Sequence, residues 1–369
     1  MSRDLRFLIL ADGLFGPETS KTANACIRYT PERVVGIIDA TRAGRRAQDV
    51  IGFGGDIPVV ATLDEGLSLR PNALLVGIAP AGGKLPAEWI LLLARAIEHG
   101  LEIWSGLHTF VGDVPELAAL AAKHRVGIHD LRRPPTRLDV ARGRVRNIDA
   151  TVVLTVGTDC NIGKMTTQLQ ILDALRAKGI RTSFAATGQT GILIEGRGIA
   201  VDAVVADFIA GAAEKMVCEA AEHADWVIVE GQGSLTHPGF SGVTLGLLHG
   251  AGPDLMVLCH NAMRETMKGY EDTGLPLRSL RELVKIYEDA AAWRRPPGYP
   301  PARVVAVALN TGDLMSSDPP NLPLTWIKDA SVATKLPAAD PIREGAAGGD
   351  RLARALIDAR GRSALTSTS

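Results

Sequence analysis

The chain has 369 residues, a formal net charge of −1, 46% hydrophobic residues and 22% charged residues, a composition typical of globular proteins. Its length predicts two domains, its near-neutral charge argues against a broad nucleic-acid surface, and no apolar run reaches the roughly 18 residues that a membrane span needs. The four cysteines are scattered and never paired as C-x-x-C, which indicates a cytoplasmic protein without a disulfide framework or a zinc site.

Residues 1–132 show short apolar segments that alternate with amphipathic ones. We predict strands at residues 7–11, 34–38, 59–60, 73–78, 101–104 and 126–128, and helices at 19–27, 86–99 and 114–124. Strands that alternate with helices in this way form a parallel sheet with both faces covered. The first domain is therefore predicted to be a Rossmann-like, doubly wound α/β domain.

The sequence leaves open whether this first domain binds a nucleotide. Asp39 follows the predicted strand 34–38, where a Rossmann domain places an acid against a ribose hydroxyl. However, the first strand-to-helix turn, at residues 11–16, lacks the G-x-G-x-x-G spacing. A cap of the strand end explains Asp39 at least as well.

The most informative segment begins the second domain. An apolar, β-branched run at residues 151–157 leads into a glycine-containing loop and then into a helical pattern at 165–177. Backbone N–H groups of such a loop and the helix dipole favour an anion, and Lys164 adds a full positive charge. Five residues separate Gly157 from Gly163, one more than in the standard P-loop. This spacing, G-T-D-x-x-x-G-K, resembles the variant P-loop of dethiobiotin synthetase and its relatives.

Met165 stands where a P-loop places the Ser/Thr hydroxyl that ligates Mg²⁺. A thioether does not ligate a hard cation, so the loop favours phosphate binding over Mg-ATP hydrolysis. If Mg²⁺ is bound, Thr166 and Glu230 are the candidate ligands. The residues predicted to contact a phosphate-bearing cosubstrate are Gly157, Thr158, Asp159, Cys160, Asn161, Gly163, Lys164, Met165, Thr166 and Asn310.

The rest of the chain continues the α/β pattern. A linker rich in Pro and Arg is predicted at residues 133–150, a P-loop NTPase-like domain at 151–358 and a polar, disordered tail at 359–369. Further strands are predicted at 182–185, 226–229, 255–259 and 304–309, and further helices at 203–222 and 280–294. The whole chain is thus predicted to be α/β, with two doubly wound parallel-sheet domains, Rossmann-like and then P-loop NTPase-like.

Polar residues follow the carboxyl ends of several strands of the second domain, where open α/β sheets bind their ligands. Glu230 is the candidate Walker B-like acid. His237 is the predicted general base because an imidazole titrates near neutral pH, and His260 is the next candidate. The residues predicted to bind the substrate are Gln189, Thr190, Gln232, Ser234, Arg264 and Arg343, and either arginine could hold a carboxylate through a bidentate fork.

Cys160 lies in the P-loop beside the helix N-terminus and Lys164. Such surroundings lower the pKa of a thiol. The position therefore allows a nucleophilic thiolate, although a passive small side chain is the simpler interpretation.

Several strings of the chain resemble one bacterial and archaeal family. They are residues 156–166, 186–194, 204–211, 229–235, 240–244 and 258–260, with 98–108 in the first domain. The family is that of the DgcN-type D-glutamate N-acetyltransferases, long labelled a domain of unknown function, and the similarity spans most of residues 5–345. The resemblance implies a Rossmann-like N-terminal domain, acetyl-CoA as donor and an acidic amino acid as acceptor. The chain departs from the family pattern in a longer insertion at 271–301 and at residues 260–264.

Three functions remain open from the sequence. An N-acetyltransferase would move acetyl from acetyl-CoA to the amine of an acidic amino acid such as D-glutamate, with Lys164 and the loop amides on the CoA phosphates. An ATP-dependent ligase or kinase of the dethiobiotin-synthetase type would bind ATP with Mg²⁺ at the same loop, which Met165 disfavours. The third is a non-enzymatic nucleotide-binding switch. We expect a small-molecule substrate, a homo-oligomer, and neither nucleic acid nor a membrane as partner.

Overall fold

The computed structural model describes residues 5–17, 19–78, 85–295, 299–312, 314 and 318–366, with side chains up to residue 361. The chain forms two compact units. The first consists of Met1–Pro134 and Gly188–Ala203, and the second of Pro135–Thr187 and Val204–Ser369. Each unit is built around one parallel sheet, which confirms the predicted α/β class.

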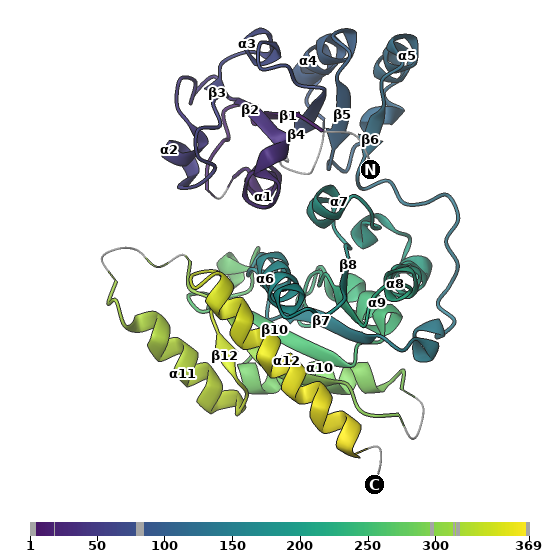
Figure 1. Cartoon of the computed structure of the whole chain (residues 1–369), viewed down its shortest axis with the longest axis vertical. Helices are drawn as coiled ribbons and strands as arrows, with labels where there is room; N and C mark the ends of the chain where they lie inside the picture. Colours follow the sequence, from purple (N-terminus) through teal and green to yellow (C-terminus); the bar gives the residue numbers. More distant parts are fainter. Residues whose placement is uncertain are drawn as a thin grey trace. The chain divides into compact units, whose positions relative to one another are not determined.

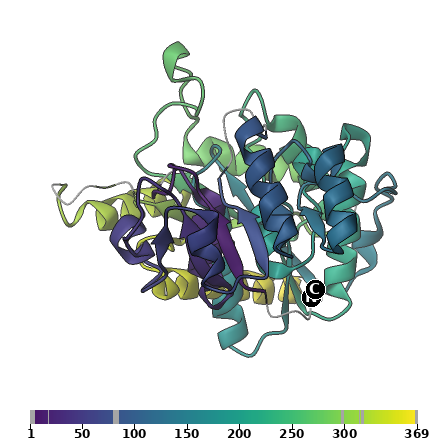
Figure 2. The same cartoon turned by 90° about the horizontal axis from the view of Figure 1, so that it is seen from above.

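The first unit has the strand order of a Rossmann domain, β3-β2-β1-β4-β5-β6. Its strands are β1 (Phe7–Leu10), β2 (Val34–Ile38), β3 (Val59–Val60), β4 (Ala73–Val76), β5 (Glu102–Ser105) and β6 (Ile128–Asp130). Its helices are α1 (Lys21–Tyr29), α2 (Ala47–Ile51), α3 (Leu63–Leu67), α4 (Ala87–Glu98), α5 (Pro115–His124) and α7 (Gln189–Glu195). Figure 1 shows α3, α4 and α5 along one side of this sheet and α1 with α7 on the other. Figure 2 shows α4 and α5 as neighbouring blue helices.

Asp39 acts as a cap in the first unit. Its carboxylate is fully buried, with one oxygen accepting from the backbone N–H of Phe15 at 2.8 Å. The other oxygen accepts from the backbone N–H of Thr41 at 2.9 Å and from its hydroxyl at 2.7 Å. Both oxygens therefore organise the loops at the sheet edge, as the capping interpretation expects.

The second unit has the strand order β12-β11-β10-β7-β9-β8, and all its pairs are parallel. The strands are β7 (Thr151–Gly157), β8 (Thr182–Ala185), β9 (Trp226–Val229), β10 (Leu255–Asn261), β11 (Arg303–Asn310) and β12 (Ala338–Ala339). Two rows of helices cover this sheet (Figure 1). The first row is α6 (Lys164–Ala177) and α12 (Ala346–Thr366), and the second is α8 (Ala206–Ala221), α9 (Ser241–Ala251), α10 (Leu280–Ala292) and α11 (Leu322–Thr334).

Strand β7 positions the candidate site. Every residue of Thr151–Gly157 is buried, because a central parallel strand is covered on both faces. After β7 the chain builds β8 and β9 on one side of it and then crosses to β10 on the other. Open α/β sheets bind ligands at the carboxyl ends of strands where the order switches in this way, and the P-loop lies at that place.

The unit boundaries differ from the continuous domains that the sequence predicted. Residues 188–203 leave the second unit and supply α7 to the first. The predicted linker at 133–150 lies mostly in the second unit, where buried Glu214 of α8 accepts hydrogen bonds from the backbone N–H groups of Arg142 at 2.9 Å and Arg144 at 2.7 Å. Hydrogen bonds to a buried carboxylate hold this segment against the second unit. The hydrophobic periodicity of the sequence cannot reveal such bonds.

The last helix reaches into residues 359–369, for which the sequence predicts a disordered tail. Helix α12 continues to Thr366. Leu352, Leu356 and Ala359 are buried along it, so an apolar stripe at helical spacing holds the helix to the unit. None of the helices in the described part of the chain combines the length and apolar character that a membrane crossing requires.

Candidate functional site at the P-loop

Two glycines shape the loop between β7 and α6. Gly163 caps α6 with a φ of 98°, a left-handed conformation that glycine adopts without strain. A Cβ atom on Gly157 would lie 2.8 Å from Nζ of Lys164 and 2.8 Å from Ile162. A larger residue at 157 would therefore displace the lysine, and this accounts for the glycine spacing seen in the sequence.

Lys164 is a buried cation. The residue is only 8% exposed, and its Nζ donates to the backbone oxygen of Asp159 at 2.7 Å. Burial lowers the pKa of this lysine, because desolvation disfavours the charged form. Among the described residues, no carboxylate lies within ion-pair distance of Nζ. A buried ammonium without a protein counter-ion is suited to binding an anionic ligand.

Asp159 joins the P-loop to the segment after β10. Its fully buried carboxylate accepts from the backbone N–H of Cys160 at 2.6 Å and from that of Lys268 at 2.8 Å. It also accepts from Nη1 of Arg264 at 3.1 Å. The carboxylate thus serves the loop itself, whereas the sequence placed Asp159 among the residues that contact a cosubstrate.

Arg264 braces the P-loop. Nη1 donates to the backbone oxygen of Cys160 as well as to Asp159. The guanidinium charge is therefore already paired with a buried carboxylate. This arrangement differs from the prediction that Arg264 holds a substrate carboxylate. The segment that carries it projects from the second unit as a green loop with the short helix η6 (Glu271–Thr273) near its tip (Figure 2).

His237 has both ring nitrogens engaged. Nε2 donates to the backbone oxygen of Lys268 at 3.1 Å, and Nδ1 accepts from the backbone N–H of Gly239 at 3.1 Å. A carbonyl can only accept and an N–H can only donate, so the two partners fix a neutral imidazole with its proton on Nε2. No lone pair remains for a substrate proton, which speaks against the predicted base role of His237.

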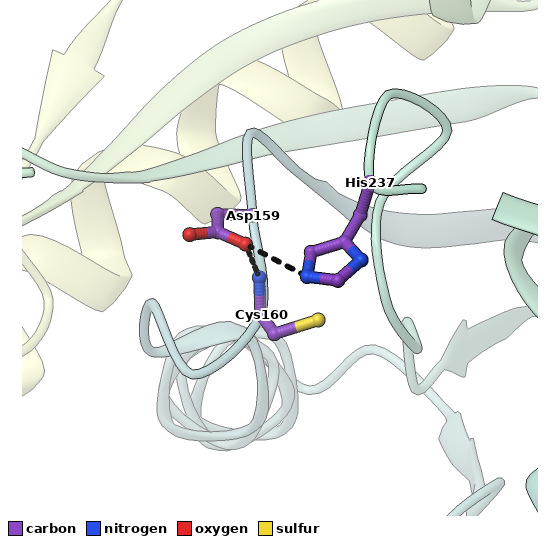
Figure 3. Close-up of side chains that lie close together, drawn as sticks. All are labelled: Asp159, Cys160 and His237. Atoms are coloured by element: carbon purple, nitrogen blue, oxygen red, sulfur yellow. Dashed lines mark hydrogen bonds and ion pairs between the residues drawn. The ribbon is translucent and has the colours of Figure 1, made fainter. Parts of the chain in front are cut away.

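Asp159, Cys160 and His237 form a cluster whose donor atoms lie within 4.8 Å of one another. Figure 3 shows the Asp159 carboxylate facing the imidazole across 3.9 Å, with Cys160 beside them on the loop. The oxygens of the carboxylate and the nitrogens of the imidazole already make the hydrogen bonds given above. Burial, which outweighs the nearby Lys164, raises the pKa of the Cys160 thiol. These residues therefore fit a metal poorly, and the predicted lowering of the thiol pKa is wrong.

His260 keeps a ring nitrogen for chemistry. It lies in β10, and its Nδ1 is 3.0 Å from the hydroxyl of Thr158. Burial, with the nearby positive charge of Arg264, lowers the pKa of His260 to about 4, so the ring is neutral at pH 7. No hydrogen bond to Nε2 is found within the described part of the chain. Of the two histidines predicted as bases, His260 is the better placed.

Glu230 directly follows β9, the strand beside β7, which is where the sequence placed a Walker B-like acid. Its Oε2 accepts from the backbone N–H of Thr187 at 3.0 Å. Gln232 donates to the hydroxyl of the same threonine at 3.1 Å. A Cβ atom on Gly231 would lie 1.7 Å from the backbone oxygen of Thr155. The hydrogen bond from Thr187 thus holds the Glu230 carboxylate at the strand end, and Gly231 lets the chain pass close to β7.

The remaining predicted residues divide into those at the P-loop and those held elsewhere. Asn310 lies beside the loop, since its Nδ2 would be 3.5 Å from a Cβ atom on Gly163. Arg343 is committed to Thr311, donating from Nε to the hydroxyl at 2.8 Å and from Nη2 to the backbone oxygen at 2.7 Å, which argues against its predicted substrate role.

Six further predicted residues complete this account. Ser234 is fully buried, 3.2 Å from the hydroxyl of Thr236. Gln189 and Thr190 begin α7, in the segment that belongs to the first unit. Met165 and Thr166 are half-buried in the first turn of α6, and Asn161 is exposed with a φ of 52°.

Sequence reasoning missed Tyr287. This fully buried side chain comes from α10, in the segment that departs from the family pattern. Its hydroxyl donates to the backbone oxygen of Gly157 at 2.7 Å and accepts from the backbone N–H of Leu235 at 3.1 Å. It therefore links the start of the P-loop to the loop after β9. Its partners are backbone atoms, and no residue pattern signals such a contact.

Together these features define a two-unit α/β protein, with a Rossmann-like unit and a P-loop unit whose buried lysine is suited to an anion. The chain belongs to the DUF1611 family: the model of its P-loop domain matches residues 139–350, and the model of its Rossmann-like N-terminal domain matches residues 40–134. Both are described as domains of unknown function. The crystal structure of a DUF1611 family protein from Anabaena variabilis has a TM-score of 0.88 and 36% sequence identity, covering 96% of this chain and 99% of that one.

Two similar proteins carry a functional name. Both are called D-glutamate N-acetyltransferase. The one from Pseudoalteromonas sp. is 39% identical over 281 residues, which are 76% of this chain and 81% of the relative. The one from Tritonibacter scottomollicae is 39% identical over 285 residues, which are 77% of this chain and 82% of the relative. The family resemblance that the motifs predicted is thereby confirmed.

Proposed function

We propose that this protein is an N-acetyltransferase that moves acetyl from acetyl-CoA to the amine of a small acidic amino acid such as D-glutamate. Relatives of that name, 39% identical over about three quarters of the chain, support the reaction class. The observation that carries the role of the P-loop is Lys164, whose buried ammonium bonds a backbone oxygen and no other atom of the residues that the structure describes. A CoA phosphate would supply the missing negative charge.

The residues present favour acetyl transfer over ATP-dependent ligation. Met165 offers a thioether where Mg-ATP enzymes use a hydroxyl. Glu230 is bonded to the backbone N–H of Thr187. A site that binds CoA phosphates through a lysine and loop amides needs no divalent cation.

The chemistry assigns one step to this chain's own groups. The neutral amine of the acceptor attacks the thioester carbonyl carbon, a C–N bond forms, the C–S bond breaks, and CoA leaves as a thiolate. The amine proton passes to Nε2 of His260 and then to the thiolate, so charge and protons balance. For this, the neutral His260 carries its own proton on Nδ1, donated to the hydroxyl of Thr158 3.0 Å away. Thr158 thus fixes the ring orientation.

Lys164→Ala tests this proposal by isothermal titration with acetyl-CoA. Loss of a charge-assisted contact costs about 1.5–3 kcal/mol, so the affinity should fall roughly 10- to 100-fold. Lys123→Ala, at an exposed lysine of α5, is the matched control and should bind like the native protein. Unchanged acetyl-CoA affinity in Lys164→Ala would refute the assigned role of the P-loop.

A product assay distinguishes the reaction classes. The native protein, acetyl-CoA and D-glutamate should give N-acetyl-D-glutamate and free CoA thiol, with the same rate in a chelator such as EDTA. Turnover that needs ATP and Mg²⁺ would instead establish the ligase alternative.

A further inference from the structure

A cavity lies in the P-loop unit, away from Lys164. It has a volume of about 110 Å³. Its lining combines apolar side chains, those of Val145, Leu248 and Ala291, with polar ones, those of Arg146, His249 and Arg294. The cavity is thus amphipathic and lined by cationic side chains.

Its position separates it from the P-loop. Ala150 and Asp254 line it, and they directly precede β7 and β10 at the amino ends of these strands. Lys164 lies past the carboxyl end of β7. A strand of this length spans roughly 20 Å at about 3.3 Å per residue, so one ligand of cavity size cannot reach both places.

The charges around the cavity do not balance. Asp254 is paired with Arg295 at 3.3 Å. Arg146 donates from Nη2 to the backbone oxygen of Arg294 at 3.0 Å, and no carboxylate pairs with it in the described residues. The guanidinium of Arg294 makes no hydrogen bond or ion pair to any residue that the structure describes. The half-buried guanidinium of Arg294 and the exposed guanidinium of Arg146 are therefore both without a carboxylate partner among the described residues.

His249 is the third polar residue of the lining named above. Its Nε2 donates to the backbone oxygen of Ala290 at 3.0 Å, which leaves Nδ1 as an acceptor in the neutral ring. Burial, together with the positive charge of Arg294, lowers the pKa of His249. The neutral form of the ring is thereby favoured, so the positive charge of the lining comes from the arginines.

We propose that this cavity is a binding site for a small oxyanion, a phosphate or a short carboxylate, distinct from the P-loop site. Arg294 and Arg146 supply the positive charge, and guanidinium groups match both anions in geometry. Pockets for drug-sized ligands have volumes of about 300–1,000 Å³, so the cavity is too small for acetyl-CoA or a nucleotide. The apolar lining residues can contact the carbon atoms of a short carboxylate.

The test uses the full chain carrying Lys164→Ala, so that anion binding at the P-loop is suppressed. Sodium phosphate and sodium acetate are titrated calorimetrically against sodium chloride of equal ionic strength. We expect saturable binding of at least one of the two anions. Adding Arg294→Gln should weaken it about tenfold or more, which corresponds to loss of one charged hydrogen bond. Adding Arg281→Gln, at an exposed arginine of α10 that is also neutralised, should leave it unchanged.

Each outcome decides the proposal. Binding of phosphate alone supports the site and assigns it to phosphate, and binding of acetate alone assigns it to carboxylates. Absence of saturable binding for both anions overturns the proposal, as does an equal loss in Arg294→Gln and Arg281→Gln. Arg294→Lys keeps the charge and should retain part of the affinity, which separates a lost contact from a damaged fold. The result is independent of acetyl-CoA binding and hence of the proposed reaction.

Discussion

Replacing Tyr287 by phenylalanine tests how the P-loop is held. The substitution removes one oxygen and little volume, so the packing of α10 is preserved. It leaves the buried backbone oxygen of Gly157 and the backbone N–H of Leu235 without the partner that now lies 2.7 Å and 3.1 Å away. An unpaired buried polar group costs about 1–3 kcal/mol. Two such groups predict a loss of about 2–6 kcal/mol in the free energy of unfolding.

The assay is thermal unfolding followed by steady-state kinetics. A loss of 1 kcal/mol lowers the melting temperature by about 2–4 °C in a unit of 150–250 residues, so Tyr287→Phe should melt about 4–24 °C below the native protein. Below the transition, its KM for acetyl-CoA should rise because the loop is less well positioned. Tyr299→Phe is the control, since that exposed hydroxyl donates to the backbone oxygen of Arg146 at 3.1 Å. Equal melting temperatures and KM values in the two variants would refute the reasoning.

Three further predictions concern the site and its support. His260→Ala should lower kcat by roughly 10²–10⁴-fold, as expected for loss of a proton acceptor, whereas His237→Ala should mainly lower the melting temperature; the reverse pattern in the same kinetic and melting assays would restore His237 as the base. The pKa of His260 is about 4 in the folded protein and about 6.5 in the unfolded chain, so between these pH values the unfolded chain binds one more proton. The free energy of unfolding therefore falls as the pH drops from 6.5 to 4, by up to about 3 kcal/mol. Urea unfolding at several pH values should show that the free energy of unfolding depends less on pH in His260→Phe than in the native protein. Gly231→Ala should prevent stable folding, because its Cβ would lie 1.7 Å from the backbone oxygen of Thr155, while Gly242→Ala, where nothing lies within 4 Å, should express and melt normally.

The sequence predicted the fold where local patterns decide it. The runs that became β2, β8 and β9 were apolar, short and bounded by polar residues, and their predicted ends coincide with the structure. Helix α9 was not predicted, because Ser241–Ala251 holds three glycines and shows little amphipathic contrast. Its Gly250 would bring a Cβ atom within 2.1 Å of the backbone oxygen of Ala210. The close packing of α8 and α9 thus requires a glycine at this position, although glycine has a low helix propensity.

The site could be predicted in position more than in role. The Gly-Lys pair and the acid after β9 placed Lys164 and Glu230 at the correct strand ends, because strand order and loop spacing determine these places. The roles of His237 and Arg264 depend on partners distant in the sequence. His237 bonds backbone atoms of Lys268 and Gly239, and Arg264 bonds a loop carboxylate. Hydrogen bonds of this kind leave no spacing pattern to recognise.

Residues 188–203 belong to the first unit, and this affects how that unit folds during synthesis. Helix α7 packs against α1 of the first unit, yet the ribosome makes it only after β7, α6 and β8 of the second unit. Domains generally fold as units from the N-terminal end during translation. Here the first unit cannot be completed until residue 203 has left the exit tunnel. During that time β7 and α6 are already synthesised, but the neighbouring strands β9 and β10 are not. A chain that ends at residue 134 lacks α7, and it would therefore leave the face of α1 that contacts α7 uncovered.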